Sequence, residues 1–174
     1  ERKIQGWKFK GAEQQVEYPL TLQPSGAVVT LRGRVDRLDE RGEALSISDI
    51  KFTKPSELKK RLHEPLSQPQ LPAYQAMLNN NTAQLDFLGL HKDEVDWVSF
   101  PELADEWQHQ GYKSWGEVLL SELSRELDTF FSGKNVWQAN PGDACEWCAV
   151  RGVCRPESLS GFATESAGEE GDDE

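Results

Sequence analysis

The chain has 174 residues, 37% hydrophobic and 9% aromatic, which suits one domain with a real core and excludes a disordered chain. It has no apolar run near the roughly 20 residues of a membrane span and no signal-peptide hydrophobic segment at its start, so we expect a cytoplasmic protein without a membrane partner. The net charge of −11 argues at first against nucleic acid, but seven acidic residues fall within 157–174, and removing them leaves −4 for residues 1–156. We therefore expect one domain over 1–156 and a disordered acidic tail over 157–174.

Hydrophobic patterns and turn residues predict strands early in the chain and helices later. The predicted elements are strands over 14–22, 27–38 (bent at Gly33) and 45–52, helices over 55–62 and 68–78, strands over 84–90 and 97–100, and an amphipathic helix over 115–132 that Gly133 ends. The polar segment 39–43 is predicted to be the turn of a hairpin. This order indicates an α/β fold with a mixed sheet flanked by helices.

Two carboxylates are predicted to meet within this hairpin. Alternation along the third strand places Ile47, Asp49 and Lys51 on one face. A register that pairs Leu38 with Ile47 also pairs Asp36 with Asp49, and two such charges repel by roughly 4 kcal/mol at an effective dielectric near 20. A Mg²⁺ or Mn²⁺ ion between them would remove that repulsion, and Lys51 could then hold a water or stabilise an anionic transition state.

Three motifs follow one another in the sequence. They are Gly33-Arg34-Val35-Asp36-Arg37, Asp49-Ile50-Lys51, and Gln70-Leu71-Pro72-Ala73-Tyr74, in which the first and last side chains share a helix face. In this order they resemble the PD-(D/E)XK nuclease superfamily, and most closely the RecB, AddAB-type and Cas4-like nuclease domains. The resemblance covers about residues 16–155.

The resemblance implies a restriction-endonuclease-like core and a Mg²⁺- or Mn²⁺-dependent deoxyribonuclease, expected to be an exonuclease, in a bacterial DNA recombination and repair helicase–nuclease. Its partners would be DNA, as single strands or duplex ends, and a helicase subunit. The residues implied in metal binding and catalysis are Asp36, Asp49, the backbone carbonyl of Ile50, Lys51, Gln70 and Tyr74. Lys51 would position the attacking water, and Gln70 and Tyr74 would orient Lys51 or contact the DNA backbone.

Basic residues gather near these motifs, and Arg34, Arg37 and Lys54 are expected to contact DNA phosphates. The nearby run at 59–61 could equally be a solvated helix face. Asp49 and Lys51 could instead form a structural ion pair, and Gln70 and Tyr74 could be ordinary helix residues.

All three cysteines, Cys145, Cys148 and Cys154, fall within ten residues. Their odd number and the absence of a secretory signal argue against disulfides, and closely spaced thiolates favour a soft metal. The resemblance implies a 4Fe–4S cluster in the full-length parent, completed by a cysteine before Glu1. A zinc site or three free thiols remain alternatives.

The related nucleases also carry a metal-binding histidine before the position of Asp36, whereas His63, His91 and His109 come later and are expected at the surface. We therefore expect an N-terminally truncated domain that is weak or inactive by itself. The alternative is a non-catalytic module of the same fold that binds DNA or a helicase subunit as a scaffold.

Overall fold

Within residues 6–133 five strands form one sheet, and the helices follow the third and fifth strands. The computed structural model describes residues 6–133. The elements are β1 (Lys8–Thr21), β2 (Val28–Arg41), β3 (Ala44–Lys51), α1 (Pro55–Arg61), the 3₁₀ turn η1 (Pro65–Ser67), α2 (Gln70–Met77), β4 (Gln84–His91), β5 (Glu94–Ser99), α3 (Asp105–His109) and α4 (Trp115–Phe131).

The sheet is mixed, as the sequence predicts. Its strand order is β1-β2-β3-β4-β5, and β3 and β4 run parallel while every other neighbouring pair is antiparallel. Because parallel neighbours need a long crossover, the segment from β3 to β4 has room for α1 and α2. The predicted α/β class is confirmed.

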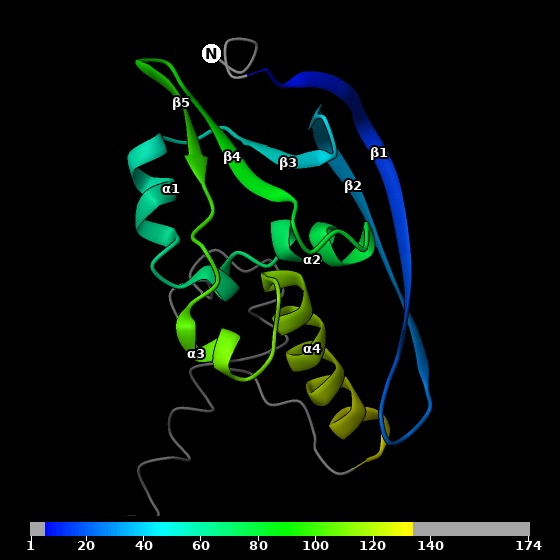
Figure 1. Cartoon of the computed structure of the whole chain (residues 1–174). Helices are drawn as coiled ribbons and strands as arrows, with labels where there is room; N and C mark the ends of the chain where they lie inside the picture. The colour runs from blue at the N-terminus through cyan, green and yellow to red at the C-terminus, as the bar shows by residue number, and fades with distance from the viewer. Residues whose placement is uncertain (1–5, 134–174) are drawn as a thin grey trace, which may run out of the picture. The chain divides into compact units, whose positions relative to one another are not determined.

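The predicted hairpin register is confirmed over the part of the ladder that exists. Leu38 pairs with Ile47, but the β2–β3 ladder ends at Arg37 and Ser48, one pair before Asp36 would meet Asp49. From that point back to Val28, β2 pairs only with β1, and Figure 1 shows the two strands continuing as a long curved ribbon. Asp36 and Asp49 therefore lie just beyond the point at which β2 leaves β3.

One face of the sheet carries the hydrophobic core. Phe87 of β4 packs in a cluster with Leu58 of α1, Leu71 of α2 and Trp115 of α4. Helices α2 and α4 can lie close together because Gly116 of α4 has no side chain. A Cβ at Gly116 would lie 2.8 Å from the Ala76 backbone nitrogen of α2. The packing of α4 against α2 therefore holds α2 against β2 and β3.

Helix α4 shows why the clearest sequence pattern is also accurate. Its N-cap Ser114 accepts a hydrogen bond from the Glu117 backbone N–H at 3.2 Å, and Gly133 follows its C-cap with φ +68°. The predicted apolar stripe is only partly buried, because Phe130 and Phe131 are exposed. None of the helices within residues 6–133 is long and apolar enough to cross a lipid bilayer.

Several predicted boundaries differ from the structure. β1 begins six residues earlier than predicted, β5 begins at Glu94 rather than Trp97, and the hairpin turn shrinks to Gly42 and Glu43 between longer strands. The sequence pattern does not predict α3. This helix has only five residues, too few to show the helical repeat of apolar side chains. The predicted boundary at residue 156, the acidic tail and the cysteine cluster lie outside the described residues.

Candidate active site

Asp36 lies where β2 separates from β3. Its carboxylate Oδ2 accepts a hydrogen bond from the Ile50 backbone N–H at 2.9 Å. The side chain thus contacts the β3 backbone just beyond the end of the β2–β3 ladder. This contact brings Asp36 into the neighbourhood of Asp49, although the two are not a ladder pair.

Asp49 is a buried carboxylate that is incompletely satisfied. It is 1% exposed, and its Oδ2 lies 2.7 Å from Lys51 Nζ. Apart from this ion pair with Lys51, the same oxygen has no hydrogen-bond donor among residues 6–133. Burial raises the pKa of Asp49, the Lys51 charge opposes that rise, and the nearby Asp36 charge adds to it. An oxygen in this condition favours a cation beside it.

A chain of hydrogen bonds holds Lys51 in place. Its Nζ donates to Gln70 Oε1 at 2.7 Å, Gln70 Nε2 donates to the Tyr74 hydroxyl at 3.1 Å, and that hydroxyl donates to the Arg34 carbonyl at 2.7 Å. The Lys51 side chain remains 31% exposed. Helix α2 therefore links the backbone of β2 to an ammonium group that solvent and substrate can still reach.

Gly33 is a close-packed position between β2 and α2. A Cβ at this residue would lie 2.6 Å from Tyr74 Cε1 and 3.1 Å from Met77 Cε. The Tyr74 ring can reach the β2 backbone only because that space is empty. Sequence reasoning predicts a strand bend at this glycine, whereas the structure gives it a close approach between a strand and a helix.

The three predicted DNA-contacting residues have different surroundings. The Arg34 side chain is exposed and pairs with Glu13 at 2.8 Å, and Lys54 is exposed at the N-cap of α1. Arg37 instead donates two hydrogen bonds to Asp39, at 2.8 and 2.7 Å. Its guanidinium is therefore already engaged with a buried carboxylate.

The residues present fit part of a magnesium-like site. Within residues 6–133, no group of three or more His, Cys, Asp and Glu side chains is arranged to hold a metal. Asp36 and Asp49 nevertheless supply two hard carboxylate donors, and the Asp49 Oδ2 atom lacks a hydrogen-bond donor there. These two side chains fit as part of a ligand set that needs further oxygen ligands.

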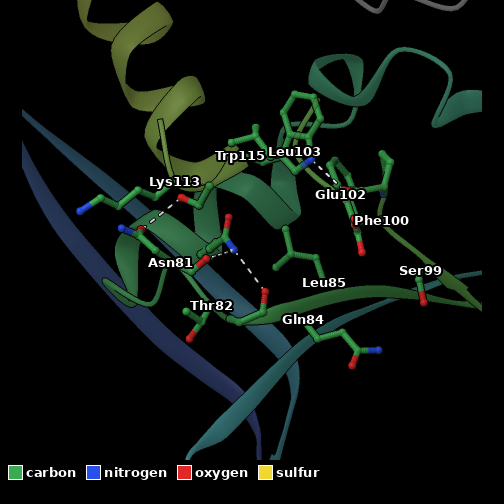
Figure 2. A pocket seen from close by; sticks show the side chains of 14 residues that line it. Asn81, Thr82, Gln84, Leu85, Ser99, Phe100, Glu102, Leu103, Lys113 and Trp115 are labelled. Carbon is green, nitrogen blue, oxygen red and sulfur yellow. Dashed lines mark hydrogen bonds between the residues drawn. The ribbon is translucent and has the colours of Figure 1, made fainter. Parts of the chain in front are cut away.

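A hollow of about 520 Å³ lies at the other end of α2, lined by none of the predicted site residues (Figure 2). Two of its polar side chains, Gln75 and Trp115, are bonded within the protein. Gln75 Oε1 accepts from the Gly116 N–H at 3.0 Å, Gln75 Nε2 donates to the Ala83 carbonyl at 3.2 Å, and Trp115 Nε1 donates to the Pro101 carbonyl at 2.8 Å. These bonds join α4 to α2 and to the segment after β5, and α2 to the residue before β4, so Gln75 and Trp115 have a structural role.

The fold and the Asp36–Asp49–Lys51 grouping define an α/β protein of the restriction-endonuclease-like class. A sequence profile of the PD-(D/E)XK nuclease superfamily matches residues 1–155, and the chain belongs to this superfamily. The resemblance drawn from the motifs is thereby confirmed at the superfamily level, while the RecB, AddAB-type and Cas4-like branch stays a prediction.

Among solved structures, one titled "Crystal structure of SSO0001" is similar to this chain, with 18% identity and a TM-score of 0.48. The match covers 83% of this chain, which spans only 58% of that structure's length. A comparison with curated proteins gives no match.

Proposed function

We propose that this chain is a metal-dependent deoxyribonuclease domain that hydrolyses phosphodiester bonds. The observation that carries this proposal is a buried Asp49 oxygen that lies beside Asp36 and Lys51 and has no hydrogen-bond donor within the described part of the chain. Membership of a nuclease superfamily supports it. If Asp49 and Lys51 formed only a structural ion pair, the pair would not need Asp36, whose negative charge repels that of Asp49.

Asp36, Asp49 and the Ile50 carbonyl would hold Mg²⁺ or Mn²⁺. A bound divalent ion supplies Lewis acidity and lowers the pKa of water. Lys51 Nζ donates a hydrogen bond to Gln70 and forms an ion pair with Asp49. Its ammonium group would orient the attacking water or neutralise charge developing on the phosphate.

Gln70 and Tyr74 are positioning residues in this scheme. The Gln70 carbonyl oxygen receives Lys51, while its amide group is fixed by the Tyr74 hydroxyl. The Tyr74 hydroxyl is in turn fixed by the Arg34 carbonyl. This arrangement supports the role of orienting Lys51 and leaves Gln70 and Tyr74 few polar atoms for DNA.

We also propose that the parent protein is a recombination and repair helicase–nuclease with exonuclease activity. The order of the three motifs and the C-x₂-C-x₅-C spacing of Cys145, Cys148 and Cys154 support this context. Anaerobically purified full-length protein should be brown, with the visible absorbance of a 4Fe–4S cluster and its iron content. Stoichiometric zinc in its place would contradict the cluster.

The test of nuclease activity uses the full-length protein with linear single- and double-stranded DNA and Mn²⁺ or Mg²⁺. We expect degradation that requires the metal and is lost in Asp49→Ala and in Lys51→Ala. Cleavage that survives both substitutions would show that the assigned site is wrong.

A second candidate function is a scaffold that binds DNA or a helicase subunit without cutting. The observation that favours it is the incomplete ligand set, since Asp36 and Asp49 supply two carboxylates and no group of three or more His, Cys, Asp and Glu side chains within residues 6–133 is arranged to hold a metal. Full-length protein that binds DNA but never cuts it with either metal would establish the scaffold.

A further inference from the structure

Lys51 contacts the same Asp49 oxygen that a bound metal ion would need. Its Nζ lies 2.7 Å from Asp49 Oδ2, which has no further hydrogen-bond donor among the described residues. Asp49 is 1% exposed, so solvent does little to stabilise the charge of this carboxylate, and a cation beside it matters more than at the surface. The lysine therefore already supplies positive charge at the atom where a divalent ion would supply it.

The Lys51 ammonium group and a divalent ion would oppose each other at this oxygen. A hard divalent ion binds carboxylate oxygens directly, as Lys51 does here. Two cations in contact with one oxygen atom lie close enough to repel, and the repulsion is stronger where the surroundings are buried than it is in water. Binding of the ion at Asp49 Oδ2 therefore favours movement of the ammonium group away from that atom.

Gln70 gives Lys51 a partner that it can keep during such a movement. Lys51 Nζ donates to Gln70 Oε1 at 2.7 Å, and the Gln70 amide group is fixed by the Tyr74 hydroxyl at 3.1 Å. The Lys51 side chain is also 31% exposed, so the ammonium group has solvent on one side. Lys51 can therefore leave Asp49 without losing its hydrogen bond to α2.

We propose that Lys51 is an internal competitor of the metal ion, which neutralises Asp49 until a divalent ion binds and then leaves Asp49 Oδ2 while Gln70 retains it. This inference rests on the proposed nuclease function and gives Lys51 a second role, the control of metal affinity. The apparent affinity of a site falls with the fraction of molecules that are ready to bind. The contact between Lys51 and Asp49 therefore raises the ion concentration at which the site fills.

The test measures Mn²⁺ binding to full-length wild-type, Lys51→Met and Gln70→Met proteins by calorimetric titration without DNA. Lys51→Met should bind Mn²⁺ about tenfold more tightly, a usual size for the coupling between two competing interactions, because nothing then competes at Asp49 Oδ2. Gln70→Met should bind Mn²⁺ a few-fold more weakly, because Lys51 loses the partner that would retain it away from Asp49. These opposite signs separate competition from a general disturbance of the site.

Lys54→Met is the matched control, because it removes one positive charge from an exposed lysine three residues after Lys51. This variant should bind Mn²⁺ as wild type does, since salt screens exposed charges. Unchanged or weaker binding by Lys51→Met, unchanged or tighter binding by Gln70→Met, or an equal gain in Lys54→Met would overturn the inference.

Thermal unfolding of Lys51→Met gives a second measurement that does not depend on catalysis. In EDTA this variant should unfold at a lower temperature than wild type, because a buried carboxylate has lost its paired cation. The same Mn²⁺ concentration should then raise the unfolding temperature of Lys51→Met by more than that of wild type, because tighter binding stabilises the folded state more. An equal or smaller rise in Lys51→Met would contradict the competition.

The outcomes also distinguish this inference from the proposed function. If wild type binds Mn²⁺ and cuts DNA, but Lys51→Met binds the ion no more tightly than wild type does, only the competition fails. If wild type neither binds Mn²⁺ nor cuts DNA, both fail, and the contact between Lys51 and Asp49 is then a structural ion pair.

Discussion

The two faces of β3 and β4 each bury a carboxylate, and the two carboxylates are treated differently. Asp86 is 1% exposed and accepts hydrogen bonds from Ser46 Oγ at 3.1 Å, Gln84 Nε2 at 3.1 Å and Ser99 Oγ at 2.8 Å. Asp49, on the other face, is equally buried, yet its Oδ2 has an ion pair and no hydrogen-bond donor among the described residues. Burial alone therefore does not distinguish the two carboxylates, whereas the number of hydrogen-bond donors does.

The sheet face that carries Asp86 also buries a second carboxylate, Asp39, and this one too accepts hydrogen bonds from the protein. Asp39 receives two hydrogen bonds from Arg37, which is the strongest common way to satisfy a buried acid. The buried Ser48 hydroxyl on this face also lacks a hydrogen-bond partner among residues 6–133, but a neutral hydroxyl costs much less to bury than a charge. On the Asp49 face the charged oxygen has one cation beside it, Lys51, and no further donor among the described residues.

The sharpest way to break this comparison is the same substitution on each face. Asp49→Asn should lower metal-dependent cleavage by the full-length protein at least about a thousandfold, the upper range for removing one group that stabilises transition-state charge. Asp86→Asn should leave the cleavage rate near wild type and lower the free energy of unfolding by about 1–3 kcal/mol, because donors that face Asp86 lose their acceptor. Initial rates on linear DNA and urea unfolding measure the two effects. Loss of cleavage in a folded Asp86→Asn variant would erase the distinction between the faces.

The next largest effect concerns the positioning of Lys51. Gly33→Ala would place a Cβ 2.6 Å from Tyr74 Cε1, so the ring must move and take Gln70 with it. We expect kcat to fall about a hundredfold with little change in KM, because displacing a catalytic group by about 1 Å can slow a reaction by about this factor.

Gly11→Ala is the matched control for Gly33→Ala, because Gly11 has open space around it and its nearest neighbouring atom is Gln14 Oε1 at 4.0 Å. Both variants should be checked for folding by thermal unfolding. If the Gly33→Ala and Gly11→Ala proteins cut equally well, the chain from the β2 backbone to Lys51 does not position the lysine.

The pH dependence of stability offers a smaller, metal-free test. Because burial raises the pKa of Asp49 above its ordinary 3.8, the folded state binds this proton more tightly than the unfolded state. The free energy of unfolding should therefore fall as pH rises from about 3.8 through the raised pKa, and the full penalty should remain at higher pH. Asp49→Asn has no such charge, so its stability should decline less across this window in urea unfolding with EDTA. Parallel curves for the two proteins would contradict the assigned cause.

The smallest effect is expected at the surface. Lys54→Ala should weaken DNA binding a few-fold and reduce the slope of log K against log salt by about one, as for one lost phosphate contact. Lys92→Ala, which removes an exposed lysine in the β4–β5 turn, should change neither quantity. Equal slopes for the two variants would remove Lys54 from the DNA path.

Much of the hairpin could be predicted because alternation fixes which side chains share a strand face. The pairing of Leu38 with Ile47 and the common face of Asp49 and Lys51 follow from a period of two and a turn. The end of the ladder at Arg37 could not be predicted, because it depends on how β2 curves away to follow β1 rather than β3.

Contacts between distant segments were less accessible to sequence reasoning. A four-residue spacing places Gln70 and Tyr74 on one helix face, but it does not reveal that Tyr74 would reach the Arg34 carbonyl over Gly33. The exposure of Phe52 was also not predicted, because an apolar residue next to a strand is expected to belong to the strand and to be buried with it.

The most direct test of the central claim is calorimetric titration of Mn²⁺ into full-length wild-type, Asp49→Asn and Asp86→Asn proteins. The account predicts that wild type and Asp86→Asn bind the ion with similar affinity, whereas Asp49→Asn loses that binding. Undiminished Mn²⁺ binding by Asp49→Asn, with the protein folded, would contradict the assignment of Asp49 as a ligand.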